Sequence, residues 1–325
     1  MAEELIRVEN IKKYYQRGSF SFNPKRRKVY VKAVDDVSFT INVGETLGFV
    51  GESGCGKSTL GRLILRLIEP DSGKIYFEGK DLLLLKGKEF QRQRREMQIV
   101  FQDPYASLNP RMRIREIIKE PLACHENLSE KEMDRRIAEL LSQVGLDPKH
   151  TWERFPHEFS GGQCQRIGIA RAIALNPKLV VCDEAVSALD VSVQAQILNL
   201  FKDLQEQYGM AYMFIAHGLN VVKHVSDRIC VMYLGKLVEM GDVQDVFKER
   251  LHPYTQALFS AIPIPDPAVE KKRILLGGDV PSPMNPPSGC RFHTRCPLKK
   301  NICSEQEPQM KDMGNAHSVA CHLFE

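Results

Sequence analysis

The feature that most constrains the fold is a glycine-rich turn that joins a short apolar strand to a helix. Residues Thr46–Val50 are apolar and β-rich, and helix signals begin at Ser58. The turn spells Gly-Glu-Ser-Gly-Cys-Gly-Lys-Ser, in which glycines let backbone N–H groups surround an anion at a helix start. This pattern predicts a site for ATP or GTP in which Lys57 reaches the β- and γ-phosphates and Ser58 holds Mg²⁺. The expected nucleotide contacts are Gly51, Ser53, Gly54, Cys55, Gly56, Lys57, Ser58 and Thr59.

An acidic pair supplies the second half of the predicted site. The apolar strand Leu179–Cys182 ends in Asp183 and Glu184. Asp183 is suited to bind Mg²⁺ through water, and Glu184 is suited to polarise an attacking water. Two carboxylates at a strand end are commonly surface groups, but together with the phosphate loop they predict nucleotide hydrolysis.

The rest of the pattern indicates an α/β domain followed by a separate tail. Buried-strand patterns return at Tyr212–Ala216 and Ile229–Tyr233 with helical stretches between them, which predicts a parallel sheet built from βαβ units. Helical periodicity from Pro110 to Val144 indicates an inserted helical subdomain. After Pro253, crowded prolines and late cysteines indicate a loop-rich module.

Composition narrows the classes of function. The 325 residues carry 45 Lys and Arg against 41 Asp and Glu, and a net charge of +4 is too small to predict nucleic-acid binding. No apolar run approaches the roughly 18 residues of a membrane span. No charged-then-apolar leader precedes Val8, so we expect a cytosolic or peripheral protein.

Four cysteines lie close together in the tail. They are Cys290, Cys296, Cys303 and Cys321. A module with a small hydrophobic core needs an additional cross-link, which a metal centre could supply. Four thiols suit either tetrahedral zinc or a [4Fe-4S] cluster. Zinc with His293 or His322 in place of a thiol, and free thiols without a metal, are the alternatives.

Three weaker features become informative in combination. A lone glutamine, Gln102, follows an apolar strand, and a lone histidine, His217, follows another. Between them, the run Ser-Gly-Gly-Gln at residues 160–163 opens a helical stretch. In this order, and together with the phosphate loop and the acidic pair, these features resemble the nucleotide-binding subunits of ABC transporters over essentially the whole chain.

The resemblance implies both a fold and a division of the chain. The expected fold is α/β, with a phosphate-loop (RecA-like) ATPase core, an antiparallel β subdomain, an inserted helical subdomain and a small Cys-containing C-terminal extension. The ATPase domain is expected at residues 1–252, with its helical subdomain at about 103–167, and the extension at residues 253–325.

The same resemblance implies roles for single residues. Tyr15 is similar to the aromatic residue that stacks on adenine, Gln102 to the residue that senses Mg²⁺ and couples to the membrane subunits, and His217 to the residue that contacts the γ-phosphate. In the family, the motif that here is Ser160, Gly161, Gly162 and Gln163 binds the ATP held by the opposite subunit, so a dimer is expected. The implied catalytic set is Glu184, His217 and Lys57, and the implied Mg²⁺ set is Ser58, Gln102 and Asp183.

Several segments resemble the oligopeptide and dipeptide importer branch of the family. They are residues 101–110, 183–196, 252–255, 262–266 and 281–296, of which residues 263–266 lie outside the part of the chain that the structure describes. The resemblance implies an F-type subunit that hydrolyses ATP to power peptide import. The implied partners are a second homologous ATPase subunit, two transmembrane permeases and an extracytoplasmic peptide-binding protein. The chain itself is expected to lie peripherally on the cytoplasmic face of the membrane. Nucleic acid is not expected as a partner. Related importer ATPases carry an iron-sulfur cluster in a similar tail, so a [4Fe-4S] cluster on the four late cysteines is expected beside ATP and Mg²⁺.

Four other functions are alternatives to peptide import. The same branch includes importers of nickel and other small solutes. Soluble ABC ATPases usually fuse two ATPase halves or insert a long coiled coil, and the chain has neither. A non-hydrolysing regulatory subunit is disfavoured because Glu184 is present, and exporters usually carry membrane spans of their own.

Overall fold

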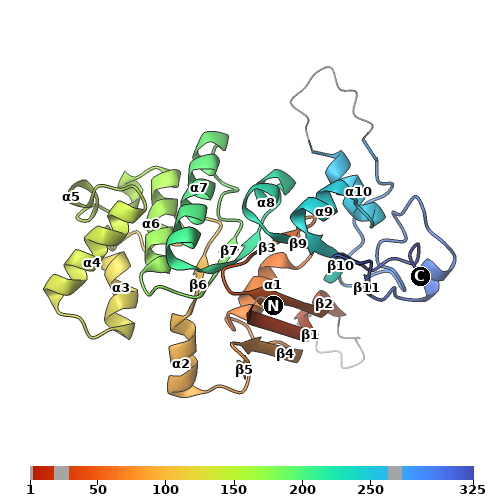
Figure 1. The fold of residues 1–325 in the computed structure, drawn as a ribbon, viewed down its shortest axis with the longest axis horizontal. Coiled ribbons are helices and arrows are strands. Elements are labelled where there is room, and N and C mark those ends of the chain that lie inside the picture. The colour runs from red at the N-terminus through yellow and green to blue at the C-terminus, as the bar shows by residue number, and fades with distance from the viewer. Residues whose placement is uncertain (1–2, 18–28, 263–272) are drawn as a thin grey trace, which may run out of the picture. The chain divides into compact units, whose positions relative to one another are not determined.

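The chain forms two compact units, and each contains both helices and β-sheet (Figure 1). A computed structural model describes residues 3–17, 29–262 and 273–325. The first unit takes its described residues from Met1–Leu5, Ile41–Thr46 and Leu84–Ala216, and the second takes them from Ile6–Thr40, Leu47–Leu83 and His217–Glu325. Within the described residues, no helix is both long enough and apolar enough to cross a membrane.

The first unit combines three parallel strands with a group of helices. Its elements are α2 (Gly87–Arg95), β6 (Met97–Val100), α3 (Ile114–His125), α4 (Glu130–Gln143), α5 (Pro148–Thr151), the 3₁₀ turn η1 (Pro156–Glu158), α6 (Gly161–Ile173), β7 (Leu179–Asp183), α7 (Val191–Tyr208) and β8 (Ala211–Ile215).

The sheet of the first unit forms its core. The strands are ordered β8-β7-β6 and run parallel, so that Cys182 pairs with Val100 on one side and with Phe214 on the other. Every residue of β7 and β8 is buried, as expected of a parallel strand that is covered on both faces. Phe201 of α7 packs edge-on against Phe214, with ring centroids 5.7 Å apart.

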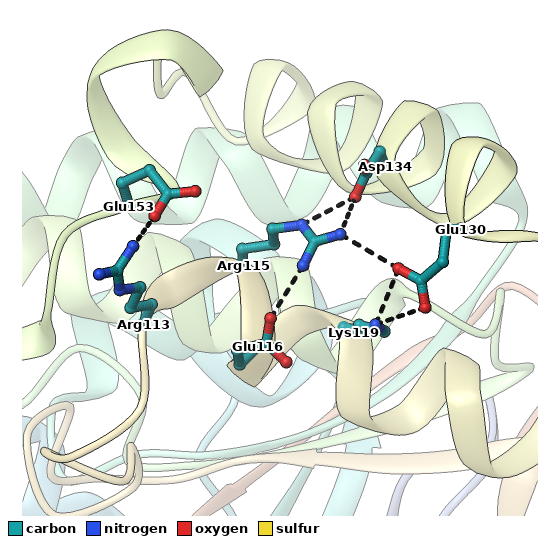
Figure 2. A network of polar contacts seen from close by, with 7 residues as sticks. All are labelled: Arg113, Arg115, Glu116, Lys119, Glu130, Asp134 and Glu153. Atoms are coloured by element: carbon teal, nitrogen blue, oxygen red, sulfur yellow. Dashed lines mark hydrogen bonds and ion pairs between the residues drawn. The ribbon is translucent and has the colours of Figure 1, made fainter.

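Helices α3, α4 and α6 of the first unit pack on one another (Figure 1). Helix α4 begins with a capping box, in which Ser129 and Glu132 satisfy each other's backbone N–H groups. A polar network joins α3 to α4 (Figure 2): Arg115 donates to Asp134 at 2.8 Å and to Glu130 at 3.2 Å.

The second unit contains two sheets. The elements that lie wholly or mostly in it are β1 (Glu4–Arg17), β2 (Val29–Asn42), β3 (Thr46–Val50), α1 (Lys57–Ile64), β4 (Ser72–Phe77), β5 (Lys80–Asp81), α8 (Leu219–Val225), β9 (Arg228–Tyr233), β10 (Lys236–Asp242), α9 (Val243–Lys248), α10 (Pro253–Ser260), α11 (Ile302–Glu305), β11 (Lys311–Asp312) and β12 (Ser318–Val319).

The two sheets of this unit differ in pattern. One has the order β2-β1-β4-β5, with antiparallel pairing of β1 to β4 and of β4 to β5. The other runs β11-β12-β10-β9-β3, and its β3–β9 pair is parallel, with Phe49 opposite Cys230. The strand β3 is buried along its whole length and ends directly at the glycine-rich turn. This sheet therefore fixes where the turn begins.

The C-terminal tail is attached to the rest of the second unit by buried contacts. Phe292 of the tail packs against Tyr233 of β9 and Tyr254 of α10, with ring centroids 5.3 and 5.4 Å apart. The guanidinium of Arg291 is buried, donates to the carbonyl of Leu234 and pairs with Asp35 of β2. The tail strand β12 pairs with β10. The tail is thus packed into the second unit.

Candidate functional site

The predicted nucleotide contacts fall into two groups. The phosphate loop, Tyr15 and His217 belong to the second unit. The residues Gln102, Asp183 and Glu184 belong to the first unit, together with the Ser-Gly-Gly-Gln run. Each group has its own geometry.

The phosphate loop has a backbone that only glycine tolerates at two points. Gly51 has φ +153°, and a Cβ there would lie 2.1 Å from the carbonyl oxygen of Met232. Gly56 has φ +107°, and a Cβ there would lie 2.0 Å from the carbonyl oxygen of Ala33. Both backbone positions therefore exclude a side chain. The loop curls tightly at the start of α1, where helix N–H groups point outward and favour an anion.

Lys57 is buried at the first position of α1, with 4% of its surface exposed. Its ammonium donates to the carbonyl oxygens of Gly51 at 2.8 Å and Glu52 at 3.1 Å, so the side chain folds back across the loop. An ammonium in this place suits phosphate oxygens. Ser58 and Thr59 follow on α1 and are half-buried. The loop thus supplies a cation, hydroxyl groups and backbone donors, which fit a nucleotide phosphate with Mg²⁺.

Cys55 is a structural member of the loop. Its side chain is 3% exposed, and burial raises the pKa of its thiol. A thiol with a raised pKa stays neutral, so it packs rather than reacts.

In the first unit, the predicted acids lie at the carboxyl edge of the sheet. Asp183 is the last residue of β7 and is 6% exposed. Val100 of β6 pairs with Cys182 of β7, and the two strands are parallel. Gln102 and Asp183 follow these paired residues, so they lie at the same edge of the sheet. Gln102 is exposed there.

Glu184 has an unusual backbone. Its φ is +54°, in the left-handed region that non-glycine residues seldom adopt. The backbone N–H of Glu184 donates to the carbonyl of Ile215 at 3.0 Å, and the hydroxyl of Ser187 donates to the carbonyl of Glu184 at 2.9 Å. The surrounding hydrogen bonds therefore hold the glutamate in a strained conformation, which is more common at active sites than elsewhere.

The Ser-Gly-Gly-Gln run forms the start of α6. Ser160 is the N-cap: its N–H donates to the side chain of Gln163 at 3.0 Å, and its hydroxyl accepts from the N–H of Gln163 at 3.4 Å. Gly162 lies against α7, because a Cβ on it would come within 2.6 Å of Val193. Ser160 and Gln163 are exposed, so the start of α6 faces outward.

Tyr15 and His217 are exposed residues of the second unit. Tyr15 is 40% exposed and borders a cleft of about 380 Å³, whose other walls include Val31 and the tail residues Pro283 and Met284. His217 directly precedes Gly218, the N-cap of α8. The backbone of Gly218 has φ −87°, which any residue can adopt.

Sequence reasoning missed a group of residues that contact the phosphate loop from the C-terminal side. Arg295 of the tail donates to both carboxylate oxygens of Glu52, at 2.9 and 3.1 Å. The hydroxyl of Tyr254 accepts from the N–H of Glu52 at 2.9 Å. Neither the spacing nor the periodicity of the sequence signals these contacts. The only hint is that Arg295 stands beside Cys296, in a segment that we interpreted through its thiols alone.

The predicted [4Fe-4S] cluster is wrong. All four late cysteines are described, yet no group of three or more His, Cys, Asp and Glu side chains among the described residues is arranged to hold a metal ion. Burial raises the pKa of the Cys290 thiol to about 11. The Sγ of Cys303 accepts a hydrogen bond from the N–H of Lys300 at 3.4 Å. The zinc alternative fails on the same arrangement, and none of the nine cysteines, all of which are described, forms a disulfide.

Two family matches cover most of the chain. Residues 34–187 match the ABC transporter family, and residues 238–303 match the C-terminal region of oligopeptide/dipeptide transporters. The second match begins within β10, covers α9 and α10 and continues into the tail through Cys303.

Similar proteins are known from sequence and from structure. The chain is 51% identical to the oligopeptide transport ATP-binding protein AppF of Bacillus subtilis (strain 168), over 99% of this chain and 98% of that protein. It is 54% identical to the oligopeptide transport ATP-binding protein OppF of Haemophilus influenzae, over 90% of this chain and 88% of that protein. The dimeric ATP-binding cassette MJ0796, solved in a post-hydrolysis state with ADP and phosphate, has a TM-score of 0.64 and 29% identity and covers 74% of this chain and 99% of its own.

The fold and the phosphate loop, taken with these matches, define an ABC-type, transport-coupled ATPase. The chain belongs to the family of oligopeptide/dipeptide ABC transporter ATP-binding proteins. The resemblance seen in the sequence is confirmed, as is the α/β fold class with its phosphate-loop core.

Proposed function

We propose that the chain is the F-type ATPase subunit of an importer of di- or oligopeptides. The observation that carries the proposal is that residues 238–303, which include the first part of the tail, match the C-terminal region of oligopeptide/dipeptide transporters. Relatives that share about half of its residues are named oligopeptide transport ATP-binding proteins and align over nearly the full chain. The division at residue 252 into an ATPase domain and an extension is part of the proposal.

The proposed assembly is a heterodimer of this chain and a second homologous ATPase subunit. The pair works on the cytoplasmic face of the membrane beneath two permeases, and an extracytoplasmic binding protein delivers the peptide. The Ser-Gly-Gly-Gln run supports the dimer, because its exposed serine and helix N-terminus are suited to a phosphate on another subunit.

Different residues of this chain have different roles in binding ATP for hydrolysis. Lys57 binds the β- and γ-phosphates, and the loop N–H groups surround them. Ser58, Gln102 and Asp183 would hold Mg²⁺, which would screen phosphate charge. Tyr15 stacks on adenine at the cleft that it borders.

Two further residues act on the reacting atoms. Glu184 orients and polarises the attacking water, and its constrained backbone favours one position of the carboxylate. His217 contacts the γ-phosphate and stabilises its developing charge. ATP favours the closed dimer because it contacts both subunits, and hydrolysis removes that preference.

Uptake by the reconstituted transporter tests the cargo. The complex, assembled from this chain and its neighbouring ATPase, permeases and binding protein, is placed in vesicles with MgATP on the ATPase side. We expect uptake of labelled di- or oligopeptides that unlabelled peptide competes away. Uptake of labelled nickel without any peptide uptake would instead assign the chain to the small-solute importers of the branch.

A further inference from the structure

A salt bridge links the C-terminal tail to the phosphate loop. Arg295 and Glu52 are 2.9 Å apart at their nearest nitrogen and oxygen, and their side chains are 9% and 25% exposed. The same guanidinium nitrogen lies 3.5 Å from the hydroxyl of Tyr233. The Nε of Arg295 is buried and has no hydrogen-bond partner among the described residues. Glu52 is therefore the main polar partner of a desolvated cation.

Glu52 is held by its backbone as well as by its carboxylate. Its N–H donates to the hydroxyl of Tyr254, and the ring of Tyr254 packs on Tyr233 and Phe292 with centroids 4.7 and 5.4 Å apart. The backbone N–H of Arg295 donates to the carbonyl of Phe292 at 3.0 Å. The aromatic cluster thus fixes Arg295 and the phosphate loop in one arrangement.

The charge of Glu52 is unfavourable in its setting. Glu52 is the second residue of a loop whose N–H groups and lysine attract the anionic phosphates of a nucleotide. An unpaired carboxylate in this loop repels those phosphates, and partial burial weakens the screening by water. The guanidinium of Arg295 cancels this charge locally.

We infer that Arg295 is a positioning residue for nucleotide binding, which neutralises Glu52 and holds the phosphate loop in its binding conformation. The tail then contributes to nucleotide binding through Arg295. This inference rests on the proposed phosphate site, and it assigns a function to a tail residue that contacts no nucleotide itself.

A binding titration on the assembled complex tests the inference. The probe is a fluorescent MgATP analogue, and the variants are Arg295→Met, Arg295→Lys and the double variant Arg295→Met with Glu52→Gln. Loss of the cation should weaken binding about tenfold, whereas lysine should keep it within about threefold because the charge remains. The double variant should recover to within about threefold, because the uncompensated carboxylate is gone.

Kinetics separate positioning from general damage. We expect the KM for ATP of Arg295→Met to rise about tenfold while kcat at saturating ATP stays within about twofold, because Arg295 does not touch the reacting atoms. Arg295→Gln carries the test if the methionine variant does not fold, since it keeps a hydrogen bond to Glu52 without the charge. Glu307→Gln is the matched control, because it breaks the tail's ion pair with Lys236 of β10 and should leave ATP binding unchanged.

Distinct outcomes overturn the inference and the proposed site. Wild-type affinity in Arg295→Met, or an equal loss in the single and double variants, contradicts the role of charge neutralisation. If Lys57→Ala binds the analogue as tightly as wild type, the phosphate site itself is wrong, whatever Arg295 does.

Discussion

Glu184 carries its carboxylate on a backbone that a glutamate rarely adopts. With φ at +54°, the residue stores strain on the order of 1–3 kcal/mol, which the hydrogen bonds to Ile215 and Ser187 offset. A surface acid at the end of a strand has no need of such a conformation. The strain therefore supports the proposed role of Glu184 in orienting water.

Replacing this carboxylate by its amide tests the role. We expect Glu184→Gln to keep nucleotide binding and stability but to lower the rate of ATP hydrolysis by about 10²-fold or more, because an amide does not act as a base. Glu206→Gln, an exposed glutamate of α7, is the control and should hydrolyse ATP at the wild-type rate. Steady-state phosphate release measures both, and undiminished turnover in Glu184→Gln would refute the assignment.

His252 sets a pH dependence of stability in the second unit. Burial lowers its pKa to about 4, its Nδ1 accepts from the N–H of Tyr254 at 3.0 Å, and its ring packs on Phe292. Nearby Glu239 is buried, accepts from the N–H of His252 at 2.9 Å and contacts His317 at 2.8 Å. His252 is therefore neutral in the folded chain at neutral pH.

The sign of this dependence follows from proton uptake. Above about pH 6.5 neither state protonates His252, and between that pH and about pH 4 only the unfolded chain does, so stability falls as the pH falls. We expect about 2 kcal/mol of stability to be lost from this residue at pH 5. Urea unfolding at pH 7.5 and pH 5 should show a smaller loss in His252→Asn, which keeps a cap acceptor for Tyr254. Equal losses in both proteins would contradict the assignment.

At the scale of elements, the start of α6 is fixed by close packing on α7. A Cβ at Gly162 would lie 2.6 Å from Val193, whereas one at Gly161 would meet its nearest atom only at 3.6 Å. We expect Gly162→Ala to lower the free energy of unfolding by about 1–3 kcal/mol, and Gly161→Ala to leave it unchanged or slightly raised. Adding Val193→Ala should recover part of the loss. Denaturant unfolding measures all of these, and full stability of Gly162→Ala would show that the contact does not constrain α6.

The network between α3 and α4 makes a second prediction at this scale (Figure 2). Arg115 is 21% exposed and contacts Asp134 at 2.6 Å, whereas Arg135 is 83% exposed and, within the described residues, forms an ion pair only with Glu139 of its own helix. We expect Arg115→Met to lower the free energy of unfolding by about 1 kcal/mol, and Arg135→Met to lower it by less than about 0.5 kcal/mol. Equal effects, measured by urea unfolding, would show that the network adds nothing beyond surface pairing.

Elements were largely predictable because their signals are local. The apolar runs before Asp183 and at Tyr212 indicated buried strands, and β7 and β8 lie there within a residue or two. The glycine pattern around Lys57 predicted the phosphate loop, because a tight turn ahead of a helix requires those glycines. The strained backbone of Glu184 was not predictable, because it depends on the neighbouring strand β8.

At the scale of the whole molecule, the sequence pattern does not indicate contacts between segments that are far apart along the chain. Arg295 and Glu52 are 243 residues apart, and no period or motif links them. The tail cysteines show the opposite error, because nearness in sequence suggested a shared metal that the described side chains are not arranged to hold. Long-range pairing depends on how the tail packs, which local pattern does not specify.

A peptide importer couples the binding of its cargo to ATP hydrolysis. The most direct measurement is the rate of ATP hydrolysis by the assembled transporter, with and without peptide-loaded binding protein. We expect peptide to raise the rate several-fold and nickel to leave it unchanged. A rate that is equally high without peptide, or in this chain without its permeases, would contradict a peptide importer and favour a soluble ATPase.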